Sequence, residues 1–119
     1  MTYEEYNAFC SALPATTYVM QWGGSHVWKV GGKVFCIGGG SEDAPAYSFK
    51  VSEIAFMILP EQAGFRPAPY LASRGLKWIE ARAGIVAQDE LRELIHASYR
   101  LVLGGLSRKK RRELGLDGI

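Results

Sequence analysis

Residues 26–37 constrain the fold more than any other part of this chain. They form two runs of β-branched and aromatic residues on either side of Gly31-Gly32. A tight two-residue turn needs positive φ angles, which glycine adopts without steric cost, so the sequence predicts a β-hairpin. A two-residue turn also fixes which residues face each other across the hairpin.

Counting outward from the turn pairs Val30 with Lys33 and Trp28 with Phe35. Residues paired across a ladder share one face of the sheet. The predicted core face therefore carries Trp28, Val30, Phe35 and Ile37 with His26 at its end, and the opposite face carries Val27, Lys29, Val34 and Cys36. This register places His26 and Cys36 on opposite faces, which argues against a thiol nucleophile activated by that histidine.

The remaining segments predict an α+β fold in the order α-β-β-β-β-α-β-α. Thr2 and Glu5 form a capping-box pattern at the start of a helix that Pro14 ends. Further strands are expected at 16–22, 46–51 and 76–82, and further helices at 53–59, 89–103 and 108–114. Short turns between consecutive strands make them antiparallel. We therefore expect a single antiparallel sheet of about five strands, with helices packed on one face.

Three segments between these elements carry breaker residues. Residues 38–43 are predicted to be a flexible loop, and residues 64–75 a structured loop with a helical turn at 68–73. Asp89 is the expected cap of the long helix, and Gly104-Gly105 is expected to end it in a left-handed conformation.

The chain of 119 residues fits a single domain, 1–119, with a basic C-terminal segment at about 106–119. Residues 105–119 carry a net charge of +3 and the remaining residues −1, so the net charge of +2 comes from the C-terminal segment. The sequence shows no basic leader and no apolar run of membrane-spanning length. We expect a cytoplasmic monomer that binds no membrane and keeps Cys10 and Cys36 reduced.

Common catalytic and metal-binding patterns are absent from the sequence. There is no CxxC, HExxH or phosphate-loop motif, and two histidines and two cysteines lie scattered along the chain. Residues 38–40 precede a strand rather than a helix, so they do not predict a phosphate cradle. We therefore expect no enzyme, metal or cofactor. A small-ligand pocket lined by Trp22, His26, Tyr70 and Trp78 is the alternative that the aromatic residues leave open.

Residues 22–35 resemble the signature of the MmcQ/YjbR family. Further blocks that resemble the family pattern occur in the expected order along the chain, at residues 13–16, 68–71, 77–79, 93–102 and 109–114. The resemblance implies a small CyaY-like fold and a DNA-binding role, and it implies no catalytic residues. The acidic iron-binding ridge of the related frataxins has no counterpart, because the first helix offers only Glu4 and Glu5. Gly104-Gly105 and the glycine-rich stretch at 38–43 depart from the family pattern.

DNA binding would require lysines and arginines that neutralise phosphates. The candidates are Lys29, Lys33, Lys50, Arg74, Lys77, Arg108, Lys109, Lys110, Arg111 and Arg112. Taken singly, each also fits an ordinary solvated surface position. The alternative is a protein- or peptide-binding adaptor or chaperone-like module. It would use an open sheet edge, or an apolar sheet face formed by Val27, Val34 and Cys36.

Overall fold

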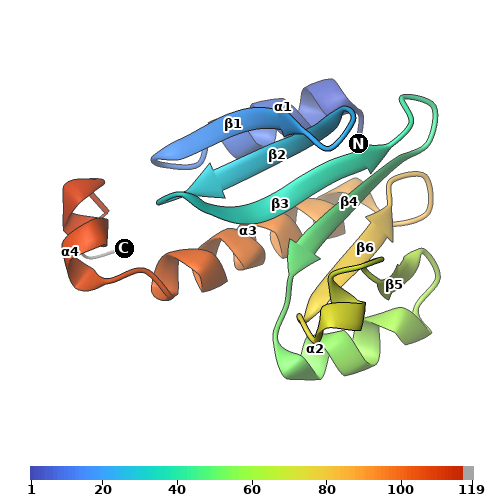
Figure 1. Ribbon diagram of the computed structural model, residues 1–119. Helices are drawn as coiled ribbons and strands as arrows, with labels where there is room; N and C mark the ends of the chain where they lie inside the picture. The colour runs from blue at the N-terminus through green and yellow to red at the C-terminus, as the bar shows by residue number, and fades with distance from the viewer. Residues whose placement is uncertain (117–119) are drawn as a thin grey trace.

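Six strands pair into one open antiparallel sheet in the order β1-β2-β3-β4-β6-β5 (Figure 1). The computed structural model describes residues 1–116; the last three residues of the predicted domain and basic segment lie outside the described part. The strands are β1 (Thr16–Gln21), β2 (Ser25–Val30), β3 (Lys33–Gly40), β4 (Pro45–Lys50), β5 (Phe65–Pro67) and β6 (Trp78–Arg82). The helices are α1 (Tyr3–Ser11), α2 (Glu53–Ile58), α3 (Gln88–Gly104) and α4 (Arg108–Glu113), and the 3-10 turns are η1 (Leu59–Glu61) and η2 (Ala72–Arg74).

The predicted α+β fold is confirmed, with one strand more than expected. The extra strand β5 lies within residues 64–75, which we predicted to be a loop. It is three residues long and pairs only with β6, at the edge of the sheet. An edge strand tolerates Pro67 because one side of it needs no ladder hydrogen bonds. A strand this short is too brief to show a period of two in the sequence.

The hairpin register is confirmed at the turn and wrong beyond it. Val30 faces Lys33 and Lys29 faces Val34, but Trp28 then faces Cys36 instead of Phe35. A β-bulge causes this shift, because β3 holds one residue more than β2 between these two pairs.

The bulge changes which residues reach the core. Phe35 and Cys36 both lie on the helix-covered face, where the Phe35 ring meets Tyr99 of α3 edge to face at 5.4 Å. Ile37 moves to the opposite face, paired with Val27. Our assignment of Cys36 to the open face and of Ile37 to the core is therefore corrected.

Helices α1 and α3 cover the same face of the sheet, and α1 begins with the predicted capping box. The Tyr6 ring lies over Gly38, where an added Cβ would approach a ring carbon to 2.7 Å. This close approach explains why residue 38 is a glycine. Residues 38–40, predicted to be a loop, continue strand β3 because they pair with β4. Tyr6, Cys10, Cys36 and Tyr47 are all fully buried together in the core.

The ends of α3 differ from the sequence prediction. The helix begins at Gln88 after an Ala87 cap that makes no side-chain hydrogen bond, so Asp89 is not its cap. At the other end Gly105 has φ −84°, which is right-handed, so the predicted left-handed ending is wrong. The chain turns instead through hydrogen bonds from Gly105 and Leu106 back to the carbonyls of the last helical turn. Within residues 1–116 no helix is both long enough and apolar enough to cross a membrane.

Candidate nucleic-acid interface

The antiparallel topology brings the predicted lysines of the sheet to one end. Lys29 and Lys33 flank the β2–β3 turn, and Lys50 is the last residue of β4. Lys50 pairs with Trp78, the first residue of β6, so Lys77 lies at the same end. Four lysines from three separate stretches of the sequence therefore lie at one end of the sheet.

The helices and one loop add arginines to this end. Arg74 lies in η2, on the connection between β5 and β6. Helix α3 runs toward the same end and is followed there by α4 (Figure 1), and its Arg100 lies beside Lys50. We call the whole set the basic end: Lys29, Lys33, Lys50, Arg74, Lys77, Arg100, Arg108, Lys109, Lys110, Arg111 and Arg112. The chain has 14 lysines and arginines, and only Arg66, Arg82 and Arg92 lie elsewhere. Glu53 and Glu113 are the carboxylates on its helices.

Shallow hollows connect members of the basic end. A hollow of about 290 Å³ is lined by Lys33 and Lys50, and a second of about 380 Å³ by Lys50 and Arg100. A third, of about 240 Å³, is lined by Arg100 and Arg111. Each hollow shares one cation with the next, so these four residues form a continuous line from the hairpin to α4.

Arg100 is the member that the sequence prediction missed. It stands on the outer side of α3, and nothing in the local pattern separates it from other exposed helix positions. Only the path of α3 toward the hairpin places it between Lys50 and Arg111.

Most cations of the basic end have no carboxylate partner. Within residues 1–116 the ion pairs are Arg66 with Glu80 at 2.7 Å and Arg92 with Asp89 at 3.4 Å. Leaving Arg112 aside, no member of the basic end takes part in an ion pair in this part of the chain. Lys77 instead places its Nζ 5.0 Å from the centre of the Phe56 ring.

One buried hydroxyl fixes the geometry of this end. Ser98 of α3 is fully buried, and its Oγ accepts a hydrogen bond from the Lys50 backbone N–H at 2.9 Å. The same Oγ donates to the carbonyl of Phe35 at 2.6 Å, at the bulge. Ser98 therefore joins α3, the end of β4 and the bulge of β3.

Apolar contacts hold α4 against the body of the protein. Leu116 is 2% exposed and belongs to the core, while Leu106 and Leu114 pack against it. Leu106 also approaches the hairpin tip, where a Cβ added at Gly31 would lie 2.6 Å from its Cδ1. Gly31 has φ +59°, so glycine is required here both for the turn and for this contact.

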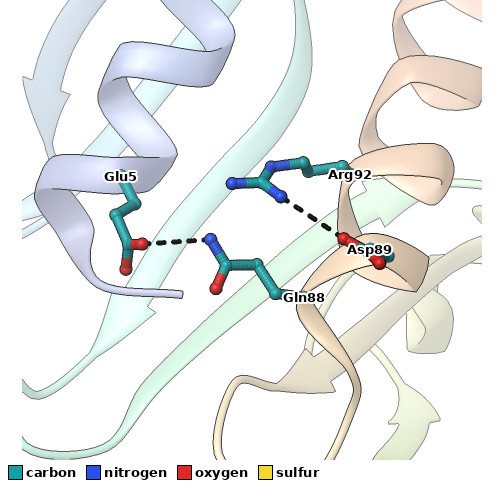
Figure 2. Close-up of polar contacts among 4 residues, drawn as sticks. All are labelled: Glu5, Gln88, Asp89 and Arg92. Carbon is teal, nitrogen blue, oxygen red and sulfur yellow. Dashed lines mark hydrogen bonds and ion pairs between the residues drawn. The ribbon is translucent and has the colours of Figure 1, made fainter.

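The opposite end of the sheet is acidic. It carries Glu4, Glu5, Glu42, Asp43, Asp89 and Glu90, from α1, the β3–β4 loop and the start of α3. We call this set the acidic end. Figure 2 shows Gln88 of α3 donating to Glu5 of α1 at 3.0 Å, beside the Asp89–Arg92 pair. The Thr2 backbone N–H and the Gln88 amide lower the pKa of Glu5 to about 2.

A cleft of about 520 Å³ lies at this acidic end. Its walls include Glu42, Asp43 and Arg82 together with the Arg66–Glu80 pair. The mixed charges of these walls do not single out one class of ligand. Among residues 1–116 no group of three or more histidines, cysteines or carboxylates is arranged to hold a metal ion.

The residues of the other sequence hypotheses do not come together. Trp78 lies at the basic end of the sheet, whereas His26 pairs with Gly38 toward the other end, so these two do not line a common pocket. The apolar sheet face differs from the expected one, because Cys36 lies on the covered face and Ile37 takes its place beside Val27, which is fully buried.

The argument against a His26–Cys36 pair also needs correction, because both residues lie on the covered face. His26 Nδ1 is 2.7 Å from the hydroxyl of Tyr18. Burial raises the pKa of the Cys36 thiol to about 12, which keeps it protonated at neutral pH. The described geometry therefore provides no thiolate at this position.

The YjbR family model matches residues 11–101. The chain belongs to the YjbR family. The match includes Arg100 and ends before α4, so the basic helix lies outside the part that defines YjbR membership.

Solved structures give the same assignment of fold. The Deinococcus radiodurans protein DR2400, described as a DUF419-domain protein, superimposes with a TM-score of 0.84 and 25% identity, covering 97% of this chain and 88% of that one. A Pseudomonas syringae protein superimposes with a TM-score of 0.71 and 15% identity, covering 86% of this chain and 99% of that one. The chain has no match among proteins of curated function.

Proposed function

We propose that this YjbR protein binds DNA through its basic end, mainly by contacts to phosphates. The observation that carries the proposal is the concentration of all but three lysines and arginines around one end of the sheet. The net charge of +2 hides this concentration, because 12 carboxylates offset the 14 lysines and arginines and six of them lie at the acidic end. A localised positive surface attracts a polyanion even when the whole protein is nearly neutral.

Within residues 1–116, and leaving Arg112 aside, the cations of the basic end form no ion pair, which supports the same proposal. A cluster of like charges destabilises a fold through repulsion. Phosphates would relieve that repulsion and release condensed counterions. Contacts of this kind carry little sequence information, so we expect binding that tolerates most sequences.

The experiment compares two triple variants in their affinity for a fluorescently labelled mixed-sequence duplex, measured by anisotropy. Lys33→Gln/Lys50→Gln/Arg100→Gln removes three charges from the line of hollows at the basic end. Arg66→Gln/Arg82→Gln/Arg92→Gln removes three charges from the rest of the molecule. Both variants have the same net charge, so the comparison isolates position from total charge.

We expect the basic-end variant to lose about tenfold or more in affinity at about 0.1 M salt, with the slope of log K against log salt reduced by about 0.9 for each lost contact. The control variant should stay within about twofold of the wild type, because exposed charges outside the interface contribute little. No binding by the wild type at about 50 mM salt would refute the proposal. Equal losses in both triple variants would refute the assignment to the basic end.

A further inference from the structure

Helix α2 exposes an apolar stripe that the fold does not use. Ile54, Met57 and Ile58 are 69%, 76% and 49% exposed. Their spacing of i, i+3 and i+4 places them on one side of the helix. The other side of α2 already packs Ala55 and Phe56 against the core. A surface helix usually needs one apolar side, and a second one indicates a contact outside the chain.

Ala55 of α2 lines an apolar groove between α2 and α3, and Ile58 of the stripe follows Ala55 by three residues, one helical turn along α2. This groove is the hollow of about 380 Å³ described above at the basic end. Its apolar lining is Val51, Ala55, Leu94, Ala97 and Leu101. Leu101 is itself 41% exposed, although it lies on a helix whose inner side is fully packed. Groove and stripe together form one apolar surface with two helical walls, which is the shape that receives a third helix.

The positive charges around the groove indicate the kind of partner that could bind in it. Lys50 and Arg100 line it, and neither forms an ion pair within residues 1–116. Lys77 adds a third positive charge over Phe56 of α2. A second copy of this chain would bring two such sets of cations together, at an electrostatic cost. Nucleic acid would use these cations for phosphate contacts and would leave the apolar floor uncovered.

We propose that the groove between α2 and α3 docks an amphipathic helix of a partner protein, with apolar anchors at i, i+3, i+4 and i+7 and carboxylates on its flanks. The anchors would cover Leu101, Ala97 and the α2 stripe, and the carboxylates would pair with Lys50 and Arg100. This proposal rests on the groove and does not depend on DNA binding. It does predict that such a helix competes with DNA, because both would use Lys50 and Arg100.

The test uses two synthetic peptides of about 14 residues, the length of an average protein helix. Both carry leucine at the anchor positions; one has glutamate on both flanks and the other has lysine. Binding is followed by chemical-shift changes in ¹H–¹⁵N spectra of the whole protein. We expect the glutamate peptide to shift the signals of residues 51–58 and 94–101, and to bind about tenfold more tightly than the lysine peptide.

Single substitutions locate the site. Leu101→Glu and Ile58→Glu should each weaken the glutamate peptide by about tenfold or more, because each adds a buried like charge. Met20→Glu is the matched control, since Met20 is 57% exposed on the distant edge strand β1, and it should leave binding unchanged.

Three results would overturn the proposal. The first is that neither peptide binds, and the second is that both bind equally. The third is a wild type that dimerises in analytical ultracentrifugation and an Ile58→Glu variant that remains monomeric, which would make a second copy the occupant.

Discussion

The charged side chains at the two ends of the sheet differ in whether they have partners within the fold. At the acidic end, Glu5 completes the capping box of α1 and accepts a hydrogen bond from Gln88, and Asp89 pairs with Arg92. At the basic end, Lys33, Lys50 and Arg100 stand around shallow hollows and form no ion pair with any carboxylate of residues 1–116. Hydrogen-bonded charges contribute to the fold itself. Like charges gathered without partners weaken it, and this is the basis on which we propose an anionic ligand for the basic end.

Helix α3 joins these two ends, and its dipole favours the charges at the acidic end. Its first turn carries Asp89 and Glu90, close to the positive end of the helix dipole. Its last turn carries no basic residue, so the cations of the basic end gain no direct stabilisation from the negative end of the dipole. The helix therefore stabilises the charges of one end only.

The contrast between the ends is tested most strongly by removing the charges of α4. We expect Arg108→Gln/Lys109→Gln/Lys110→Gln/Arg111→Gln to lower DNA affinity by about a hundredfold at about 0.1 M salt, because four phosphate contacts would be lost. Anisotropy titrations over a range of salt concentrations measure both the affinity and the slope.

Substitution is preferable to deleting residues 106–119, because Leu116 belongs to the core and its loss would disturb the fold. Circular dichroism should show unchanged helix content and melting temperature in the variant. A variant that binds DNA as tightly as the wild type would show that α4 serves only to cover the end of the core.

A smaller effect is expected from the anchor of the basic end. Ser98→Ala removes the buried hydroxyl that bonds both the Lys50 N–H and the Phe35 carbonyl, and leaves those two groups without this partner. We expect a loss of about 2 kcal/mol in the free energy of unfolding, measured by urea denaturation. Ser48→Ala, at a half-buried position on the open face, is the control and should cost under about 0.5 kcal/mol. Equal losses of unfolding free energy in Ser98→Ala and Ser48→Ala would show that the Ser98 hydroxyl does not anchor the basic end.

The sequence predicted what depends on local chemistry. Gly31 and Gly32 both have positive φ, as the turn requires, and Thr2 and Glu5 form the predicted capping box. The bulge was not predictable, because Phe35 and Cys36 are both apolar and either could point into a core. One extra residue on β3 was enough to reverse the faces assigned to Cys36 and Ile37.

The basic end was predictable as a list of residues and not as a surface. Lys29, Lys50 and Arg108 are separated by long stretches of sequence, and only the strand order and the direction of α3 bring them to one end. Arg100 was missed for the same reason. The α2–α3 groove likewise requires the packing of two helices that are not adjacent in the sequence.

The smallest effect is expected at the acidic end, where it appears as a dependence on pH. The folded-state pKa of Glu5, about 2, lies below the ordinary value for a glutamate. A carboxylate with a lowered folded-state pKa stabilises the fold fully above its unfolded pKa, and this contribution disappears as the pH falls through the folded pKa. The stability difference between wild type and Glu5→Gln should therefore be largest above about pH 5 and shrink toward pH 2.

Urea denaturation across this pH range measures the difference, with Glu4→Gln as the control on the same helical turn. Because Glu5 is exposed and screened by solvent, the change should be smaller than that of the buried Ser98. A difference that stays constant with pH would mean that the contacts from Thr2 and Gln88 do not hold this carboxylate, and the contrast between the two ends would then rest on the cations alone.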